Sequence, residues 1–267
     1  MKSYIAIFFL IGLFSTNSFA EIVRLKMATT TSTENSGLLA ELNPVFENKY
    51  NAKVDVIAVG TGKAIRIAEN GDVDLIMVHA PDAEKKFIEK GFGIERLPVM
   101  HNDFIIIGPK DDPAGISKTD NLTAAMNILH EGNHPFISRG DDSGTHKKEK
   151  LLWQMTGKHP HADWYLSVGQ SMGAVLRIAD DKNAYALTDR GTYLAFMDNI
   201  SLTTAFENDA ALFNPYHVIV VNPDKHSHTN VDLATKYVNF IRGELGQSII
   251  RDFKVNGKIL FHPDVIK

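Results

Sequence analysis

Apolar and polar positions along the chain follow two kinds of spacing. Short apolar runs at residues 54–59, 73–78 and 104–107 are typical of buried β-strands. Between such runs, apolar residues recur with helical spacing, and Gly, Pro or Asn marks the segment ends. This alternation of strand and helix predicts α/β layers built around mostly parallel sheets.

The remaining segments extend the same pattern over the whole chain. We expect further strands at residues 22–28, 136–137, 184–187 and 218–221, and helices at residues 37–50, 63–69, 81–90, 121–129, 148–155, 170–179, 188–197, 231–241 and 245–253. Ser32 or Thr33 is the predicted N-cap of the helix at 37–50, and Thr188 is the predicted N-cap of the helix at 188–197.

So many helices would overfill one small sheet, and we therefore expect two lobes. The first and last segments, residues 21–105 and 218–267, would form lobe 1, and residues 106–217 would form lobe 2. A hinge of two strands, near residues 104–107 and 216–220, would connect them.

The first twenty residues have the pattern of an export signal. Lys2 precedes an apolar run of eleven residues, 4–14, and small residues stand at Ser18 and Ala20. A helix that spans a bilayer needs about 20 apolar residues, so this run is too short for an anchor. We expect a signal peptide over residues 1–20 that is cut after Ala20, and a protein exported to the periplasm.

Composition narrows the possible functions. The 267 residues include 28 Lys+Arg and 32 Asp+Glu, for a formal net charge of −4, which argues against a nucleic-acid-binding protein. The chain has no Cys, so thiolate metal sites and cysteine nucleophiles are excluded. The close histidine pairs 159/161 and 226/228 lack a nearby carboxylate cluster. We therefore expect neither a resident metal nor a cofactor.

Several predicted strand-to-helix turns are rich in glycine and hydroxyl side chains. The first backbone N–H groups of a helix have no partner and lie at the positive end of the helix dipole, so an anion fits there. Small residues let the backbone approach the anion, and hydroxyls add neutral donors. The candidate donors are Thr30, Thr31, Ser32, Thr61, Ser143, Gly144, Thr145, Ser171 and Gly173.

The most specific segment is Ser-Arg-Gly-Asp-Asp-Ser-Gly-Thr-His at residues 138–146. Arg139 offers a planar fork of donors that suits an oxyanion. The two hydroxyls of Ser143 and Thr145 follow at the start of a helix. We expect Asp141 and Asp142 to hold Arg139 or to cap that helix.

The spacing Arg-x-x-x-Ser-Gly-Thr resembles the anion loop of periplasmic phosphate-binding proteins. Together with Thr-Thr-Thr-Ser at 29–32 and Leu-Thr-Asp-Arg-Gly-Thr-Tyr at 187–193, the chain is more similar to the tungstate-binding proteins of ABC transporters. This resemblance implies a two-lobed periplasmic-binding-protein fold that closes over a tetrahedral oxyanion, as a monomer, and delivers it to a membrane permease. It also implies that the candidate donors above, with Arg139, contact the ligand.

One departure from the phosphate-binding pattern concerns His79. Phosphate-binding proteins carry Ser-Asp-Ala-Pro where this chain has Val-His-Ala-Pro at 78–81. A carboxylate can accept the proton of a protonated phosphate but would repel tungstate or molybdate, which are unprotonated near pH 7. A histidine can donate instead. Our hypothesis is that His79 lines the site and disfavours phosphate; Arg190 is either a second cation near the site or a partner of Asp189.

Other functions remain open at this stage. Molybdate, phosphate or sulfate would suit the same fold, and a signalling module that reports anion binding to a membrane sensor would use the same site. A periplasmic hydrolase with Ser143 and His146 is the alternative from a different class. It is disfavoured because triad partners normally come from separate segments and no Gly-x-Ser-x-Gly turn is present.

Overall fold

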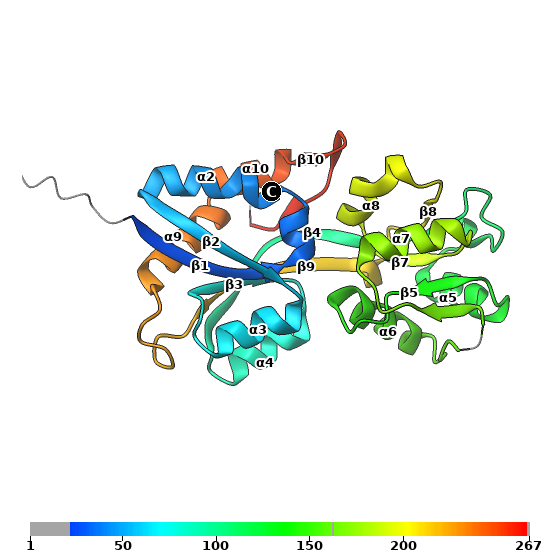
Figure 1. The fold of residues 1–267 in the computed structure, drawn as a ribbon, viewed down its shortest axis with the longest axis horizontal. Coiled ribbons are helices and arrows are strands. Elements are labelled where there is room, and N and C mark those ends of the chain that lie inside the picture. The colour runs from blue at the N-terminus through cyan, green and yellow to red at the C-terminus, as the bar shows by residue number, and fades with distance from the viewer. Residues whose placement is uncertain (1–21, 162, 266–267) are drawn as a thin grey trace, which may run out of the picture.

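The computed structural model describes residues 22–161 and 163–265 (Figure 1). The expected signal peptide lies outside this range. The described chain folds into two lobes, each with helices packed around strands, and two long strands run from one lobe to the other. Among the described helices, none combines the length and apolar character needed to cross a bilayer.

Lobe 1 is built on a mixed sheet in the strand order β12-β4-β9-β3-β1-β2. Strand β1, next to the edge strand β2, pairs in parallel with β2 and β3, as expected of βαβ units. Strand β9 returns from lobe 2 and pairs antiparallel with β3 and β4. The bounds of these strands are β1 Val23–Thr30, β2 Ala52–Val59, β3 Leu75–Val78, β4 Gly93–Gly108, β9 Phe213–Val221 and β12 His262–Pro263.

Helices cover both faces of this sheet because successive side chains of each strand point to opposite sides. On β1, Leu25 and Met27 pack beneath α2, α9 and α10, whereas Ala28 belongs to the cluster beneath α3 and α4. The helices on one face are α2 Leu38–Tyr50, α9 Val231–Arg242 and α10 Glu244–Asp252, and those on the other face are α3 Thr61–Glu69 and α4 Pro81–Glu89.

Lobe 2 uses the far end of β4 in the same way. Phe104 and Ile106 contact the cluster beneath α5 and α6, and Ile105 and Ile107 face α7 and α8. Strands β7 and β8 pair antiparallel with this end of β4, and β5 pairs in parallel with β6. The elements are α5 Leu122–Glu131, β5 Phe136–Ser138, α6 Gly144–Met155, β6 Tyr165–Ser167, α7 Met172–Asp181, β7 Ala186–Asp189, α8 Arg190–Phe196 and β8 Thr203–Phe206.

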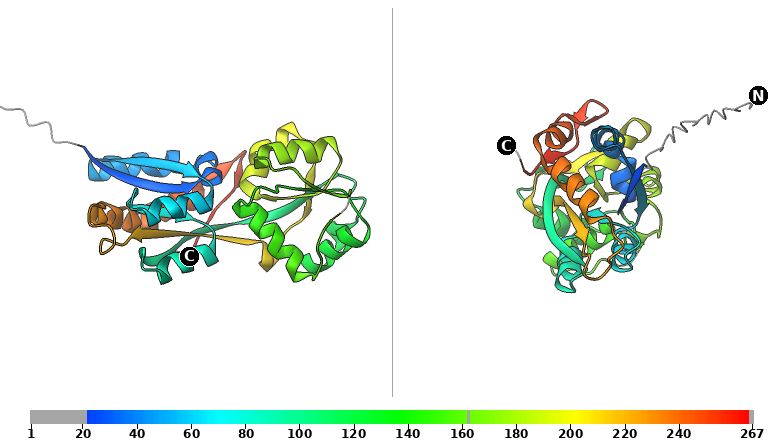
Figure 2. Two further views of the ribbon diagram at one scale, coloured as in Figure 1. Left: turned by 60° about the horizontal axis from the view of Figure 1, so that its bottom comes forward. Right: turned by 90° about the vertical axis from the view of Figure 1, so that its left-hand side faces the viewer.

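Three segments connect the lobes. Strands β4 and β9 cross side by side between them, as Figure 2 shows, and the C-terminal segment adds a brace. In that segment, β10 Lys254–Val255 and β11 Lys258–Ile259 form a hairpin, and Asn256 donates a hydrogen bond to the carbonyl of Leu194 in α8. The hinge therefore contains a tail contact in addition to the two strands predicted from sequence.

The structure differs from the sequence prediction in strand direction, in two short strands and in helix N-caps. Parallel pairing holds for β1–β3 and β5–β6, but the crossing strands pair antiparallel with all their neighbours. The strands β6 and β8 are only three and four residues long and were not predicted. The predicted N-cap of the first long helix is wrong: α2 begins after Gly37, and residues 31–35 form a separate short helix, α1 (Thr31–Asn35), capped by Thr30. Asp189, not Thr188, caps α8.

A buried ion pair stabilises the junction of α4 with the crossing strands. The Glu84 side chain is fully buried and accepts hydrogen bonds from Arg96 at 2.7 Å and from the backbone N–H of Ala80 at 2.5 Å. His217 of β9 lies 3.1 Å from both Glu84 and Arg96. Because Ala80 follows His79, this cluster fixes the backbone of a candidate site residue.

We predict that Arg96→Ala lowers the free energy of unfolding by about 3 kcal/mol, because the Glu84 carboxylate would remain buried without its charged partner. Urea denaturation would measure the change. The control is Arg24→Ala, which breaks an exposed pair with Asp55 and should have little effect. Equal losses in the two variants would contradict a structural role for the buried pair.

Candidate functional site

The first element of the candidate site is the turn from β1 into α1. Thr29 is anchored by a hydrogen bond from its hydroxyl to the Met77 carbonyl, 2.7 Å away. Thr30 then caps α1: its Oγ1 accepts from the Thr33 N–H at 3.2 Å and lies 2.6 Å from the Thr33 hydroxyl. Thr30 is buried, Ser32 is half-buried and Thr31 is exposed. This turn therefore holds a small array of hydroxyls at the end of β1.

His79 follows β3, the strand beside β1, and faces the same hydroxyls. Its Nε2 lies 3.3 Å from Thr30 Oγ1 and 3.5 Å from Ser32 Oγ. Its Nδ1 lies 2.9 Å from Asn214 Oδ1, and its ring stacks on Tyr216 with centroids 4.6 Å apart. Burial holds the pKa of His79 below its usual value. The neutral ring is thus fixed on both sides.

The Arg139 loop follows β5 in lobe 2. Asp141 accepts hydrogen bonds from Arg139 Nε at 2.8 Å and from the Ser143 N–H at 3.1 Å. Burial alone would raise the pKa of the Asp141 carboxyl, but these bonds hold it below its usual value. Of the two acidic residues, Asp141 therefore holds Arg139, whereas Asp142 pairs with Lys150 at 3.0 Å.

A buried carboxyl supports this loop from behind. Glu149 of α6 accepts hydrogen bonds from the Ser138 hydroxyl at 2.8 Å, the Tyr165 hydroxyl at 2.6 Å and the Trp153 indole at 3.2 Å. The backbone N–H of Arg139 also donates to it, although burial raises the pKa of Glu149 above its usual value. These contacts join β5, β6 and α6 at the residue before Arg139.

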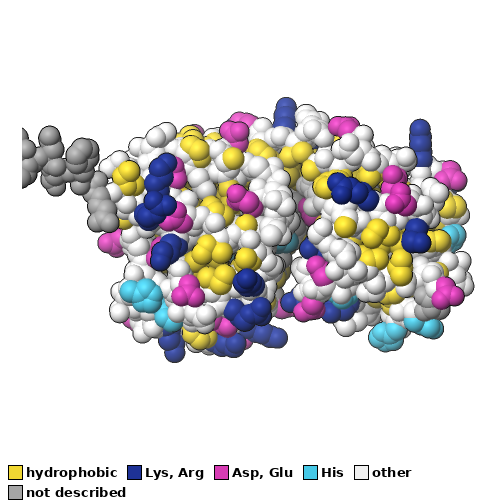
Figure 3. Space-filling model, in the orientation of Figure 1, with side chains coloured by type: hydrophobic (Ala, Val, Ile, Leu, Met, Phe, Trp, Pro, Cys, Tyr) yellow, Lys and Arg dark blue, Asp and Glu magenta, His cyan; other side chains and the backbone are white. Residues whose placement is uncertain are grey.

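The two halves meet at one cleft between the lobes, visible as a groove in Figure 3. A cavity of ≈ 210 Å³ is lined from lobe 1 by Thr31 and Ser32, and from lobe 2 by Arg139, Ser171 and Gly173. Among the described residues, the Arg139 side chain donates a hydrogen bond to Asp141 alone, through Nε. Its terminal nitrogens thus have no protein acceptor there.

The lobes are closed over this cleft. A Cβ placed on Gly144, the first residue of α6, would lie 3.5 Å from Thr61 Oγ1 and 3.7 Å from His79 Cε1. The start of α6 in lobe 2 is therefore in contact with the start of α3 and with His79 in lobe 1. Ser143 caps α6, and Thr145 is buried in its first turn.

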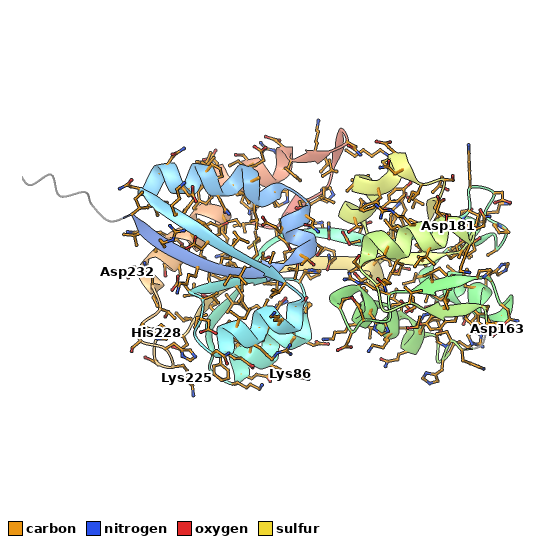
Figure 4. The ribbon with its side chains drawn as sticks, in the orientation of Figure 1. Lys86, Asp163, Asp181, Lys225, His228 and Asp232 are labelled. Carbon is orange, nitrogen blue, oxygen red and sulfur yellow. The ribbon has the colours of Figure 1, made fainter. Side chains whose placement is uncertain are left out.

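A second, larger cavity opens beside His79 and Gly144. It measures ≈ 680 Å³ and has lysines from both lobes on its wall, namely Lys86, Lys147, Lys148 and Lys150. Lys86 lies on α4 at the edge of lobe 1 (Figure 4). The rim of the cleft is thus basic although the chain as a whole is acidic.

Some sequence expectations take a different form in the structure. Gly173 has a packing reason, since a Cβ there would lie 2.5 Å from Phe196 Cζ. Arg190 lies neither on Asp189 nor in the 210 Å³ cavity; it makes hydrogen bonds to Asp103 and Glu207. Ser143 Oγ accepts from the backbone N–H of His146, whose Nδ1 accepts from that of Asp142, so the described side chains form no triad.

Asn214, Tyr216 and Glu149 were missed by sequence reasoning. Each is separated from the residue it supports by many positions or lies on a helix face that looked solvated. The signal that could have found Asn214 is a polar residue at the start of an apolar crossing strand. No group of three or more potential metal-ligating side chains occurs among the described residues.

The sequence and the fold of this chain are similar to those of known proteins. Residues 20–244 match the family model described as a PBP superfamily domain. The tungstate-binding protein TupA of Peptoclostridium acidaminophilum is 43% identical over 245 residues, which are 90% of this chain and 86% of that protein.

Two solved structures are similar over most of the chain. The tungstate ABC transporter structure from Geobacter sulfurreducens is 51% identical, with a TM-score of 0.79, over 86% of this chain and 98% of that one. The tungstate-binding protein TupA from Desulfovibrio alaskensis is 45% identical, with a TM-score of 0.84, over 91% and 100%.

The Arg139 loop also yields a stability prediction. Gly140 has φ +66°, and a Cβ there would collide with Ser167 and approach the Gly169 N–H, whereas Gly157, with φ +67°, has open space around it. A side chain in this left-handed region costs about 1 kcal/mol. We expect Gly157→Ala to lose about that much unfolding free energy and Gly140→Ala to lose more, as measured by urea denaturation. Indistinguishable losses would argue against close packing beneath the loop.

Proposed function

This chain belongs to the PBP superfamily and, within it, to the family of tungstate-binding proteins of ABC transporters, and we propose that it captures the tungstate dianion between its lobes. It is the substrate-binding component of a transporter and not an enzyme. In our proposal it acts as a periplasmic monomer, exported by residues 1–20, and delivers the anion to a membrane permease.

The observation that carries the proposed site is the shared cavity. Thr31 and Ser32 of lobe 1 line the same ≈ 210 Å³ space as Arg139 and Ser171 of lobe 2. A small oxyanion there would be held by donors from both lobes, so its binding would favour the closed form. The proposed contacts that line this cavity are Thr31, Ser32, Arg139, Ser171 and Gly173. The other proposed contacts do not line it and would have to be reached beside it: Thr30, Thr61, His79, Ser143, Gly144 and Thr145.

The charge of the site suits a dianion. Arg139 contributes one positive charge, and a helix start contributes about half a charge. Arg139 and the start of α7 line the 210 Å³ cavity, and the starts of α3 and α6 lie close together beside His79. In our proposal these sources compensate about two negative charges, without a lysine in the 210 Å³ cavity. The lysines of the neighbouring cavity would attract anions to the cleft from a distance.

Calorimetric titration of refolded, anion-stripped protein tests the function. We expect one tungstate to bind per chain. Phosphate should bind more weakly because it carries a proton near pH 7 into a cleft of donors, whereas sulfate is also an unprotonated dianion and would be distinguished only by its smaller size. Molybdate, of nearly the same size and charge, is the informative competitor. Absence of tungstate binding in this experiment would refute the proposal.

We predict that Arg139→Ala weakens tungstate binding by about 2–5 kcal/mol, since a desolvated dianion would lose its one charged hydrogen-bond partner. Titration calorimetry measures the affinity. Arg24→Ala, which removes the same charge from the surface, controls for a general electrostatic effect and should bind like the parent. If Arg139→Ala also bound like the parent, the site would have to lie elsewhere.

We further predict that His79→Asp lowers tungstate affinity about hundredfold, because a buried carboxylate would repel the dianion. The same variant should gain affinity for phosphate, whose proton the carboxylate can accept. Competition titrations with both anions, and a thermal unfolding scan to verify folding, would check the result. Unchanged affinities for both anions would remove His79 from the selectivity mechanism.

A further inference from the structure

The side chains around His79 determine which ring nitrogen carries its hydrogen. The Asn214 amide nitrogen donates to Asn102 Oδ1 at 2.6 Å and lies 3.3 Å from the Tyr216 hydroxyl. The amide oxygen of Asn214 is therefore the atom that faces His79 Nδ1 at 2.9 Å. An amide oxygen only accepts, so His79 Nδ1 must donate.

A neutral imidazole has a single N–H, and in His79 it is used on Asn214. Nε2 of the neutral ring is consequently a bare acceptor, and it faces the hydroxyls of Thr30 and Ser32. While the ring is neutral, one of these hydroxyls donates its hydrogen to Nε2. Nε2 of neutral His79 therefore accepts a hydrogen bond and cannot donate one to the anion, contrary to the hypothesis from the sequence.

A bound dianion conflicts with this arrangement. Nε2 of the neutral ring needs one hydroxyl hydrogen, so Thr30 and Ser32 cannot both donate to an anion oxygen. If both hydroxyls turn toward the anion, Nε2 remains buried without a donor and faces oxygen lone pairs. A proton on Nε2 removes the conflict, because the ring then donates to a hydroxyl oxygen and that hydroxyl donates to the anion.

Charged groups around the ring also favour protonation once the anion is present. Glu84 of α4 and Asp189 at the end of β7 raise the pKa of His79, whereas burial is the dominant cause that keeps it low. Glu84 is paired with Arg96 and lies near His217, and Asp189 accepts two hydrogen bonds from Thr192. The remaining charged groups on the wall of the cavity beside His79 are Asp82, Lys86, Lys147, Lys148 and Lys150.

Resting on the proposed tungstate function, we propose that His79 is a proton-linked positioning residue: it takes up one proton from solvent at Nε2 when the dianion binds, and so turns the hydroxyls of Thr30 and Ser32 into donors to the ligand. Neutral His79 instead leaves those hydroxyls free to accept a hydrogen from an anion that carries its own proton. The protonation state of one ring thereby sets the direction of the hydrogen bonds in the lobe 1 half of the site.

The pH dependence follows from the direction of the change. Burial holds the pKa of His79 below its usual value, and a dianion bound beside the ring would raise it. Tungstate affinity should therefore fall about tenfold per pH unit between the free-state pKa and the bound-state pKa. It should be flat below the free-state pKa, where the ring is already charged, and flat again above the bound-state pKa, where the ring stays neutral.

Titration calorimetry near pH 7.5, in non-phosphate buffers of different ionisation enthalpy, measures the proton uptake directly. We expect the parent to take up close to one proton per tungstate. His79→Gln, with a permanent amide donor in place of Nε2, should take up none and show a flat pH profile. His146→Gln removes the half-buried histidine of the Arg139 loop and, whatever its affinity, should retain the uptake.

A second variant tests the proposed proton uptake by His79, here called the relay, without removing the imidazole ring. Asn214→Asp places a carboxylate on Nδ1, so the empty protein should already hold the extra proton and proton uptake on binding should decrease. NMR titration of the His79 ring in that variant should give a higher pKa than in the parent. Tungstate binding by the parent without proton uptake, or uptake that persists in His79→Gln, would overturn the relay alone. Absence of tungstate binding by the parent would overturn the proposed function as well.

Discussion

A tetrahedral dianion leaves water only when fixed donors replace its hydration shell from several sides at once. No single turn of this chain can surround such an ion, and the fold meets the constraint by bringing two turns together across a cleft. Hydroxyls and helix starts of lobe 1 oppose the Arg139 loop of lobe 2 in one small cavity. Long crossing strands, a closable cleft and small residues at the helix starts all serve this convergence.

Much of this architecture is visible in local sequence. The hydroxyl turn at 29–32 and the Arg139 loop are contiguous motifs, and their chemistry depends on backbone N–H groups that any helix start exposes. The alternation of strands and helices likewise reflects local periodicity. The two-lobed α/β fold and the family could therefore be predicted from residues a few positions apart.

The supporting contacts could not be predicted, because they join distant segments. His79 depends on Asn214, which is 135 positions away, and on the stacking of Tyr216. Glu149 stands in the charged run 147–150, a pattern typical of a solvated helix face, but it is buried beneath the Arg139 loop. Its three side-chain partners there come from β5, β6 and α6. Arg190 found carboxylates from two other segments rather than its neighbour Asp189. The N-cap residues of the helices also differ from the predicted ones, since several side chains that can cap a helix stand next to one another at each turn.

The order of the strands has a consequence for how the family can diversify. β4 ends at Gly108 and β9 begins at Phe213, so the chain between them is a single continuous insert that carries Arg139 and its loop. Exchange of that insert between related genes needs only two junctions, both in adjacent paired strands. A chimaera made this way would take Arg139 from one parent and His79 from the other, so the two halves of the proposed site could change independently.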